Sequence, residues 1–299
     1  MLNVLDLHGR PIHNLQPADL RVSINHKQVD VARATYLVQP RRIVIVLDTS
    51  GSMAGSRAGR KWAVARQAAE DVLSIASPEI PIAMVTFSTD VVKTFEFATD
   101  RDQLRQWLRD TKREDLRGTT GLLDAVMAAT HVLQPPEEGD AIYAISDGQD
   151  THSRISADRL RLTLLRQGVR LFMFKLADRG PESEVETTKN LQDVAVATGG
   201  FIFGRSALSP ISWEGGEEYD FNSRVQETIQ LQTTVLIFQI SGFYRVEVNA
   251  KVPFRDDSRV SLEVVDARGK RRKDITATYQ RYLSACSSLS PASDNAPSR

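Results

Sequence analysis

Hydrophobic and polar residues follow two alternating patterns between Arg42 and about residue 230. Short runs rich in β-branched residues, such as "RIVIVLD" and "DAIYAIS", are apolar at successive positions, as strands covered on both faces are. Longer stretches between them repeat apolar residues at spacings of three and four, which is typical of helices with one buried face. This alternation predicts an open, doubly wound α/β domain with a mostly parallel sheet flanked by helices.

The individual elements of this domain can be read from the same patterns. Strands are expected in "RIVIVLD", "PIAMVTFS", "VVKTFEFA", "DAIYAIS", "VRLFMFKLA" and "GGFIFG". Helices are expected at 62–76, 104–108, 123–133, 156–167 and 191–197, where the apolar residues recur with the helical period.

The two flanks of the chain have a different pattern, because residues 2–38 and 233–266 alternate with a period of two. The runs "TTVLIFQI", "FYRVEVNAKV" and "RVSLEVVD" are therefore predicted to be strands. Neither flank has enough strands to bury itself, so we expect both to pair into one small β domain into which the α/β domain is inserted.

These patterns divide the chain into four parts. Residues 1–40 form the first part of the accessory β domain, residues 41–232 the α/β domain, and residues 233–283 the second part of the β domain. Residues 284–299, which include "SSLSPASDNAPSR", are rich in Ser, Pro and Ala without a period. We expect this tail to be disordered.

Composition narrows the possible partners. The 38 basic and 38 acidic residues cancel, so no global field favours nucleic acid. The single cysteine, Cys286, provides neither an internal disulfide nor a structural zinc site. The first residues lack the pattern of a secretory signal, and no segment is apolar for long enough to span a bilayer.

Polar oxygens gather where the predicted strands end. Asp48 directly follows "IVIVL", and Asp147 directly follows "AIYAIS". A third loop, "LRGTTGLLDA", brings Thr119 and Thr120 to the start of a predicted helix. Because ligands of open α/β sheets bind at the carboxyl ends of the strands, we expect these side chains to meet in one crevice.

The residue types at this edge favour a hard divalent cation. Mg²⁺ prefers six oxygen ligands, and Ser50 and Ser52 flank Gly51, so both hydroxyls can turn toward one point. Zinc or copper would favour His or Cys, but the five histidines are scattered along the chain. An ion held mostly by neutral hydroxyls keeps part of its charge, so it could bind an acidic side chain from outside.

Three segments together resemble a known family. "DTSGS", "GTTGLLDAV" and "SDGQD", in this order, are similar to the metal-ion-dependent adhesion site of von Willebrand factor A domains. The resemblance implies a Rossmann-like fold and a bound Mg²⁺, Mn²⁺ or Ca²⁺. Aligned with the family pattern, "GTTGLLDA" favours Thr120 as the threonine ligand, and Thr119, which stands where the family has a second glycine, is the alternative. The implied metal ligands are Asp48, Ser50, Ser52, Thr120 and Asp147.

The resemblance extends into the flanks. "VLDLHGRPIHNLQPADLRVSINHKQ" and "LQDVAVATGGFIF" resemble segments of a bacterial von Willebrand factor A-related family first described in acidobacteria. Together the similar segments cover roughly residues 2–250. Relatives of this kind are commonly exported, which implies an extracytoplasmic location, although this chain shows no signal segment.

Three functions follow from these observations. The resemblance implies a non-enzymatic adhesion or assembly module, whose metal coordinates an acidic residue of a protein partner. The alternative is a Mg²⁺-dependent, phosphatase-like hydrolase with Asp48 as nucleophile. Such an enzyme normally has a second carboxylate two residues on and a lysine reaching in, whereas position 50 is Ser. In the third, the metal only orders the loops of a structural domain.

Overall fold

The computed structural model describes residues 1–54, 60–176, 185–204, 223–249 and 257–284. Within them, one sheet is mostly parallel and has the strand order β6-β5-β4-β7-β8-β9. Only its edge strand β6 runs antiparallel to its neighbour. The strands are β4 (Ile43–Asp48), β5 (Ile82–Phe87), β6 (Val91–Phe95), β7 (Ala141–Ser146), β8 (Arg170–Lys175) and β9 (Ile202–Gly204).

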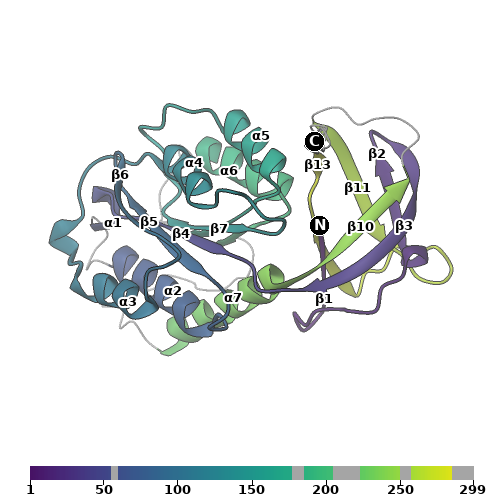
Figure 1. The fold of residues 1–299 in the computed structure, drawn as a ribbon, viewed down its shortest axis with the longest axis horizontal. Helices are drawn as coiled ribbons and strands as arrows, with labels where there is room; N and C mark the ends of the chain where they lie inside the picture. Colours follow the sequence, from purple (N-terminus) through teal and green to yellow (C-terminus); the bar gives the residue numbers. More distant parts are fainter. Residues whose placement is uncertain (55–59, 177–184, 205–222, 250–256, 285–299) are drawn as a thin grey trace, which may run out of the picture.

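Helices cover both faces of this sheet (Figure 1). The helices are α1 (Gly51–Ala54), α2 (Arg60–Ile75), α3 (Arg101–Asp110), α4 (Leu122–Val132), α5 (Ala157–Gln167), α6 (Val185–Ala197) and α7 (Ser223–Ser241). Helices α2, α3 and α7 lie on one face, and α4, α5 and α6 on the other. The α/β architecture predicted from the hydrophobic pattern is thus confirmed.

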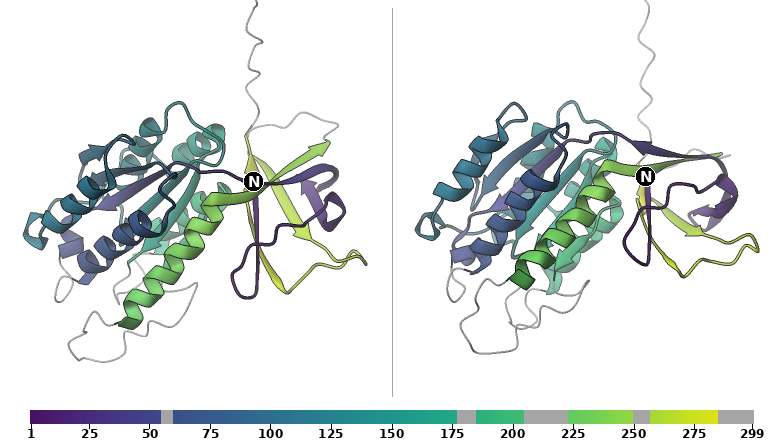
Figure 2. Two further views of the ribbon diagram at one scale, coloured as in Figure 1. Left: turned by 60° about the horizontal axis from the view of Figure 1, so that its bottom comes forward. Right: turned by 90° about the horizontal axis from the view of Figure 1, so that it is seen from below.

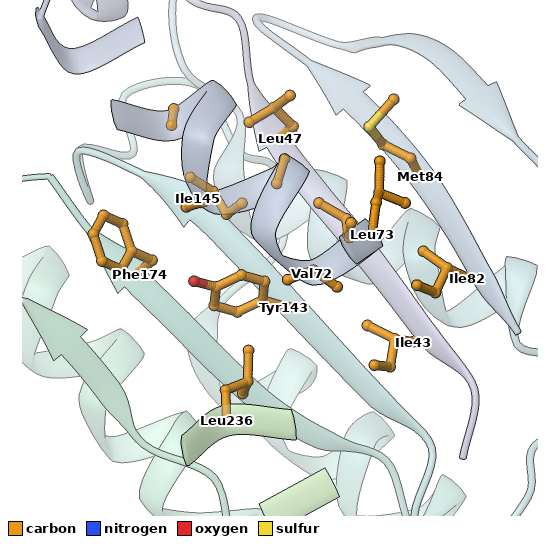
Figure 3. Close-up of a cluster of buried hydrophobic side chains, with 14 of the residues drawn as sticks. Ile43, Leu47, Val72, Leu73, Ile82, Met84, Tyr143, Ile145, Phe174 and Leu236 are labelled. Atoms are coloured by element: carbon orange, nitrogen blue, oxygen red, sulfur yellow. The ribbon is translucent and has the colours of Figure 1, made fainter. Parts of the chain in front are cut away.

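The central position of β4 in the sheet explains why its sequence is apolar throughout. Ile43, Ile45 and Leu47 pack with α2 and α7 on one face, while Val44 and Val46 pack with α4 and α5 on the other. Figure 3 shows the first of these cores, where Ile43 and Leu47 lie against α2. A central strand needs apolar side chains at both odd and even positions because successive side chains point to opposite faces of the sheet.

The second sheet is antiparallel, with strand order β12-β1-β10-β3-β2-β11-β13. It curls around a core that includes Leu2, Val22, Tyr244 and Leu262 (Figure 1). Its strands are β1 (Leu2–Asp6), β2 (Leu20–Ile24), β3 (Lys27–Val38), β10 (Gly242–Asn249), β11 (Ser258–Val264), β12 (Ile275–Tyr279) and β13 (Tyr282–Leu283).

Strands from both flanks of the chain share this sheet. The chain leaves it through β3 and returns through β10, and these two strands pair with each other from Gly242 opposite Val38 onward. Figure 2 shows β3 leading into β4 and α7 leading into β10, so that the α/β domain is inserted between them. We expected a small β domain, but its sheet has seven strands, one more than the six-stranded α/β sheet.

The strand predicted for "TTVLIFQI" is wrong, because these residues lie within α7. Ile229, Thr233, Leu236 and Ile240 are all buried, and their spacings of four, three and four belong to one helical face. Packing of this face onto the α/β sheet outweighs the strand propensity of the β-branched residues. The first C-terminal strand therefore begins at Gly242. Of the tail predicted to be disordered, residues 285–299 lie outside the described part of the chain.

A buried arginine connects the two sheets. Arg170, the first residue of β8, is 0% exposed and donates hydrogen bonds to Asn3 Oδ1 (3.3 Å) and to the carbonyls of Gln239 (2.7 Å), Gly139 (3.2 Å) and Ile240 (3.1 Å). Burial lowers the pKa of its guanidinium to about 9. Asn3 in turn donates to the carbonyls of Gln239 and Gly242, so β1, β8 and the end of α7 are joined.

None of the helices in the described residues is both long and apolar enough to cross a membrane.

Candidate metal centre

Main-chain hydrogen bonds join the three loops that sequence analysis singled out. The amide of Gly51 donates to the carbonyl of Gly118 over 3.1 Å, which joins the loop after β4 to the loop before α4. The amides of Thr151 and His152 both donate to the carbonyl of Thr120, at 2.9 and 3.0 Å, which joins the loop after β7 to the same loop. The loops therefore meet at the carboxyl edge of the sheet.

Asp48 ends β4 and is fully buried. Its Oδ1 accepts a hydrogen bond from the Ser50 amide (2.8 Å), and its Oδ2 accepts one from the Ser146 hydroxyl (2.6 Å). Burial raises the pKa of Asp48 to about 6, against the lowering effect of hydrogen bonds from Ser146 and Ser50. The nearby charge of Asp147 raises this pKa further. A cation beside Asp48 would favour the ionised form of its carboxyl.

The hydroxyls of Ser50 and Ser52 lie side by side, with 3.1 Å between their Oγ atoms. Adjacent ligands of an octahedral Mg²⁺, each about 2.1 Å from the ion, are about 3.0 Å apart. Ser50 is fully buried, while Ser52 is partly exposed. The spacing of the two hydroxyls therefore fits two neighbouring positions of one coordination shell.

The two threonines of the loop before α4 differ in their surroundings. Thr120 is 3% exposed, and its carbonyl accepts the amides of the loop that follows Asp147. Thr119 is exposed, and its hydroxyl lies 3.0 Å from that of Thr89 in the β5–β6 turn. Thr120 is thus the better placed of the two beside the aspartates, and its role as a ligand stays a prediction.

Asp147 directly follows β7, and a lysine that sequence analysis missed forms an ion pair with it. Lys61 Nζ lies 2.9 Å from Asp147 Oδ2, and the exposed fractions of the two side chains are 7% and 1%. The other oxygen, Oδ1, accepts the amide of Gln149 (3.2 Å). Lys61 stands four residues before buried Ala65 on α2, and a lysine on a buried helical stripe is the signal that could have identified it.

Ser146 was also missed. It is the last residue of β7, where its hydroxyl donates to Asp48 and accepts the amide of Gly148 (3.1 Å). A hydroxyl residue that ends an otherwise apolar strand and directly precedes Asp147 was the available signal.

The donor set at this edge fits a hard cation. Among the described residues, no group of three or more His, Cys, Asp or Glu side chains could hold a metal, so hydroxyl oxygens would have to complete the coordination. Carboxylate and hydroxyl oxygens suit Mg²⁺ better than zinc or copper. The residues that would hold the ion are the predicted ones: Asp48, Ser50, Ser52, Thr120 and Asp147.

No curated protein matches the chain significantly. Among solved structures, an aerotolerance-related membrane protein from Bacteroides fragilis is 15% identical with a TM-score of 0.44, over 64% of this chain and 98% of that one. BatB, a conserved hypothetical protein from Bacteroides thetaiotaomicron, is 15% identical with a TM-score of 0.44, over 67% and 99%. Proximal thread matrix protein 1 of the mussel byssus is 13% identical with a TM-score of 0.49, over 73% and 51%.

The family comparison is more specific. Residues 43–149 match the model of the von Willebrand factor type A domain. The match begins at the first residue of β4 and ends just after Asp147, so it includes all five residues predicted as metal ligands. The chain is therefore a protein with a von Willebrand factor type A domain.

Proposed function

We propose that this chain is a metal-dependent protein-binding module for adhesion or assembly. A divalent cation, Mg²⁺ or alternatively Mn²⁺ or Ca²⁺, is held by Asp48, Ser50, Ser52, Thr120 and Asp147. It coordinates an acidic side chain presented by a partner protein. The observation that carries the proposal is the 3.1 Å separation of the Ser50 and Ser52 hydroxyls beside the buried carboxylate of Asp48.

The charges around this edge explain why the ion would accept an acid from outside. Two aspartates balance a divalent ion, while Lys61, paired with Asp147, adds one positive charge. The hydroxyl ligands are neutral, so the centre keeps a net charge of about +1 in a largely buried setting, where electrostatic attraction is strong. A partner's carboxylate supplies both the missing charge and an oxygen ligand.

Selection of peptides from a random phage-displayed library tests the proposal. Peptides are selected on the immobilised protein in Mg²⁺ and eluted with chelator. We expect the recovered peptides to share an Asp or Glu and to lose binding when that residue becomes Asn or Gln. They should also fail to bind a Ser50→Ala/Ser52→Ala double variant. Peptides that bind equally well in chelator would contradict the proposal. A metal that raises only the melting temperature would favour a structural role.

One observation favours the hydrolase as a second candidate, since Lys61 supplies the lysine that an Asp-nucleophile enzyme requires. Against it, position 50 is Ser, and Asp48 is fully buried with both carboxylate oxygens accepting hydrogen bonds. A nucleophile must be able to approach its substrate. Turnover of p-nitrophenyl phosphate in Mg²⁺ that Asp48→Asn abolishes would support the enzyme, and we expect no such turnover.

A further inference from the structure

We propose that Lys61 is a built-in cation that competes with the divalent ion for Asp147. The lysine thereby limits the affinity of the centre for metal and stabilises the metal-free protein. This inference rests on the proposed metal-binding function, and it concerns a residue outside the five predicted ligands.

The ion pair between Lys61 and Asp147 is inside the protein rather than on its surface. Its two charged atoms are 2.9 Å apart, and both side chains are nearly inaccessible. Surface pairs contribute little because water and salt screen them. A buried pair is screened much less, so removal of one partner leaves a costly unpaired charge.

Lys61 lies on a helix that is packed against the sheet. Lys61 stands in the first turn of α2, and its neighbours Trp62, Val64 and Ala65 are buried in the core against the sheet. Asp147, the other member of the ion pair, directly follows the end of β7. The ammonium is thus held at the carboxylate by packing of the helix, as well as by the ion pair itself.

Both oxygens of Asp147 already accept hydrogen bonds, Oδ1 from the Gln149 amide and Oδ2 from Lys61. An ion that binds Asp147 must share or displace one of these donors. If it binds Oδ2, it lies within about 5 Å of the ammonium, given an ion–oxygen distance of about 2.1 Å and the 2.9 Å ion pair. Like charges this close in a buried site repel each other, which weakens metal binding.

The lysine has the opposite effect when no metal is bound. Asp48 and Asp147 are buried carboxylates of like charge, and the charge of Asp147 is felt at Asp48. Lys61 neutralises one of them and so reduces their repulsion. The metal-free loops are therefore stabilised by the lysine, and the metal-bound loops by the ion.

Substitution Lys61→Met tests this exchange, because Met keeps the apolar stem and removes the charge. The full chain, stripped with chelator, is titrated with Mn²⁺ by calorimetry, and its melting temperature is measured in chelator and in excess Mn²⁺. We expect a Kd at least about tenfold lower than that of the unsubstituted chain. We also expect a lower melting temperature in chelator and a larger rise with Mn²⁺, because binding to the folded state adds stability in proportion to the logarithm of metal over Kd.

Lys93→Met is the matched control. Lys93 is an exposed residue of the edge strand β6, with its ammonium over the ring of Phe95. The control loses the same charge far from Asp147 in the sheet order, so its Kd for Mn²⁺ should stay within about twofold of the unsubstituted value. An equal gain in both variants would overturn the inference, because it would reflect net charge alone.

The remaining outcomes separate this inference from the proposed function. If the unsubstituted chain binds Mn²⁺ and Lys61→Met binds it equally or more weakly, the competition by Lys61 is disproved and the metal site stands. If neither protein binds Mn²⁺, the proposed function fails and this inference fails with it. If Lys61→Met folds only with Mn²⁺ present, the exchange is supported, and a variant that Mn²⁺ does not rescue contradicts it.

Discussion

The hydroxyl of Ser146 donates a 2.6 Å hydrogen bond to the carboxylate of Asp48, although the two residues are 98 positions apart in the chain. Ser146 ends β7 and Asp48 ends β4, and these strands are parallel neighbours. Since Asp147 is the next residue, this bond holds the strand ends that carry the two aspartates together without any ion. The centre is thus built on the sheet as well as on its loops.

Ser146→Ala should destabilise the fold around the candidate metal site. The buried carboxylate of Asp48 loses a donor, which costs about 1–3 kcal/mol of the free energy of unfolding and raises the pKa of Asp48 further. Urea unfolding in chelator measures the loss. Thr163→Ala, which removes a hydroxyl of α5 that donates to the carbonyl of Arg159 in the same helix, should change stability by less than about 0.5 kcal/mol. Equal losses in both variants would count against the role of Ser146.

Asp48 should make the metal-free protein less stable as the pH rises from about 4 to 6. Its pKa is about 6 when folded, against an ordinary value of 3.8, so in this window the folded state holds a proton that the unfolded state has released. Stability therefore falls as the pH rises, by about 3 kcal/mol in total, and levels off above pH 6. The observable is the unfolding free energy of the unsubstituted chain minus that of Asp48→Asn, in chelator. A difference that grows with pH would contradict the raised pKa.

The two threonines before α4 should respond differently to the same change. Thr120→Val removes a hydroxyl but keeps the shape, and we expect the Kd for Mn²⁺ to rise about tenfold or more, since a ligand oxygen is lost. Thr119→Val should leave the Kd within about twofold, because this residue is exposed and faces Thr89. Calorimetric titration of both variants decides between them. The reverse order would make Thr119 the ligand.

Arg170→Met should destabilise the junction of the two sheets and leave the metal site unchanged. Buried carbonyls, among them those of Gly139, Gln239 and Ile240, lose their charged donor, which costs about 3 kcal/mol. Arg170 begins β8, whereas the candidate centre lies at the carboxyl ends of the strands, so the Kd for Mn²⁺ should not change.

The control for this variant is Arg272→Ala, which breaks a partly exposed ion pair with Asp274 and should cost less than about 1 kcal/mol. Chemical denaturation of both variants gives the comparison. If Arg170→Met were no more destabilising than the control, the buried arginine would not hold the junction.

Much of the fold follows from period and burial in the sequence. Strands buried on both faces, such as β4 and β7, are predicted from their unbroken apolar runs, and α2 from its stripe ending near Ala76. The end of α7 could not be found in the same way, because "TTVLIFQI" is apolar and β-branched at positions that satisfy both periods. Its conformation is decided by the sheet on which Leu236 and Ile240 pack.

The candidate site, like the fold, could be predicted only in part from the sequence. Asp48 and Asp147 could be expected together because Asp48 ends β4 and Asp147 directly follows β7, its parallel neighbour. The burial of Lys61 could be expected from its place on the apolar stripe of α2, but its contact with Asp147 could not, since that contact depends on how α2 packs across the sheet. Contacts between residues far apart in the chain depend on this packing, and periodicity describes only the separate elements.

Diffraction from crystals grown in Mn²⁺, with anomalous data, tests the central claim most directly. The account predicts one strong anomalous peak between the hydroxyls of Ser50 and Ser52, within roughly 2.1 to 2.4 Å of both, and next to Asp48. An empty map at this position in abundant Mn²⁺, or the ammonium of Lys61 found there in place of an ion, would contradict it.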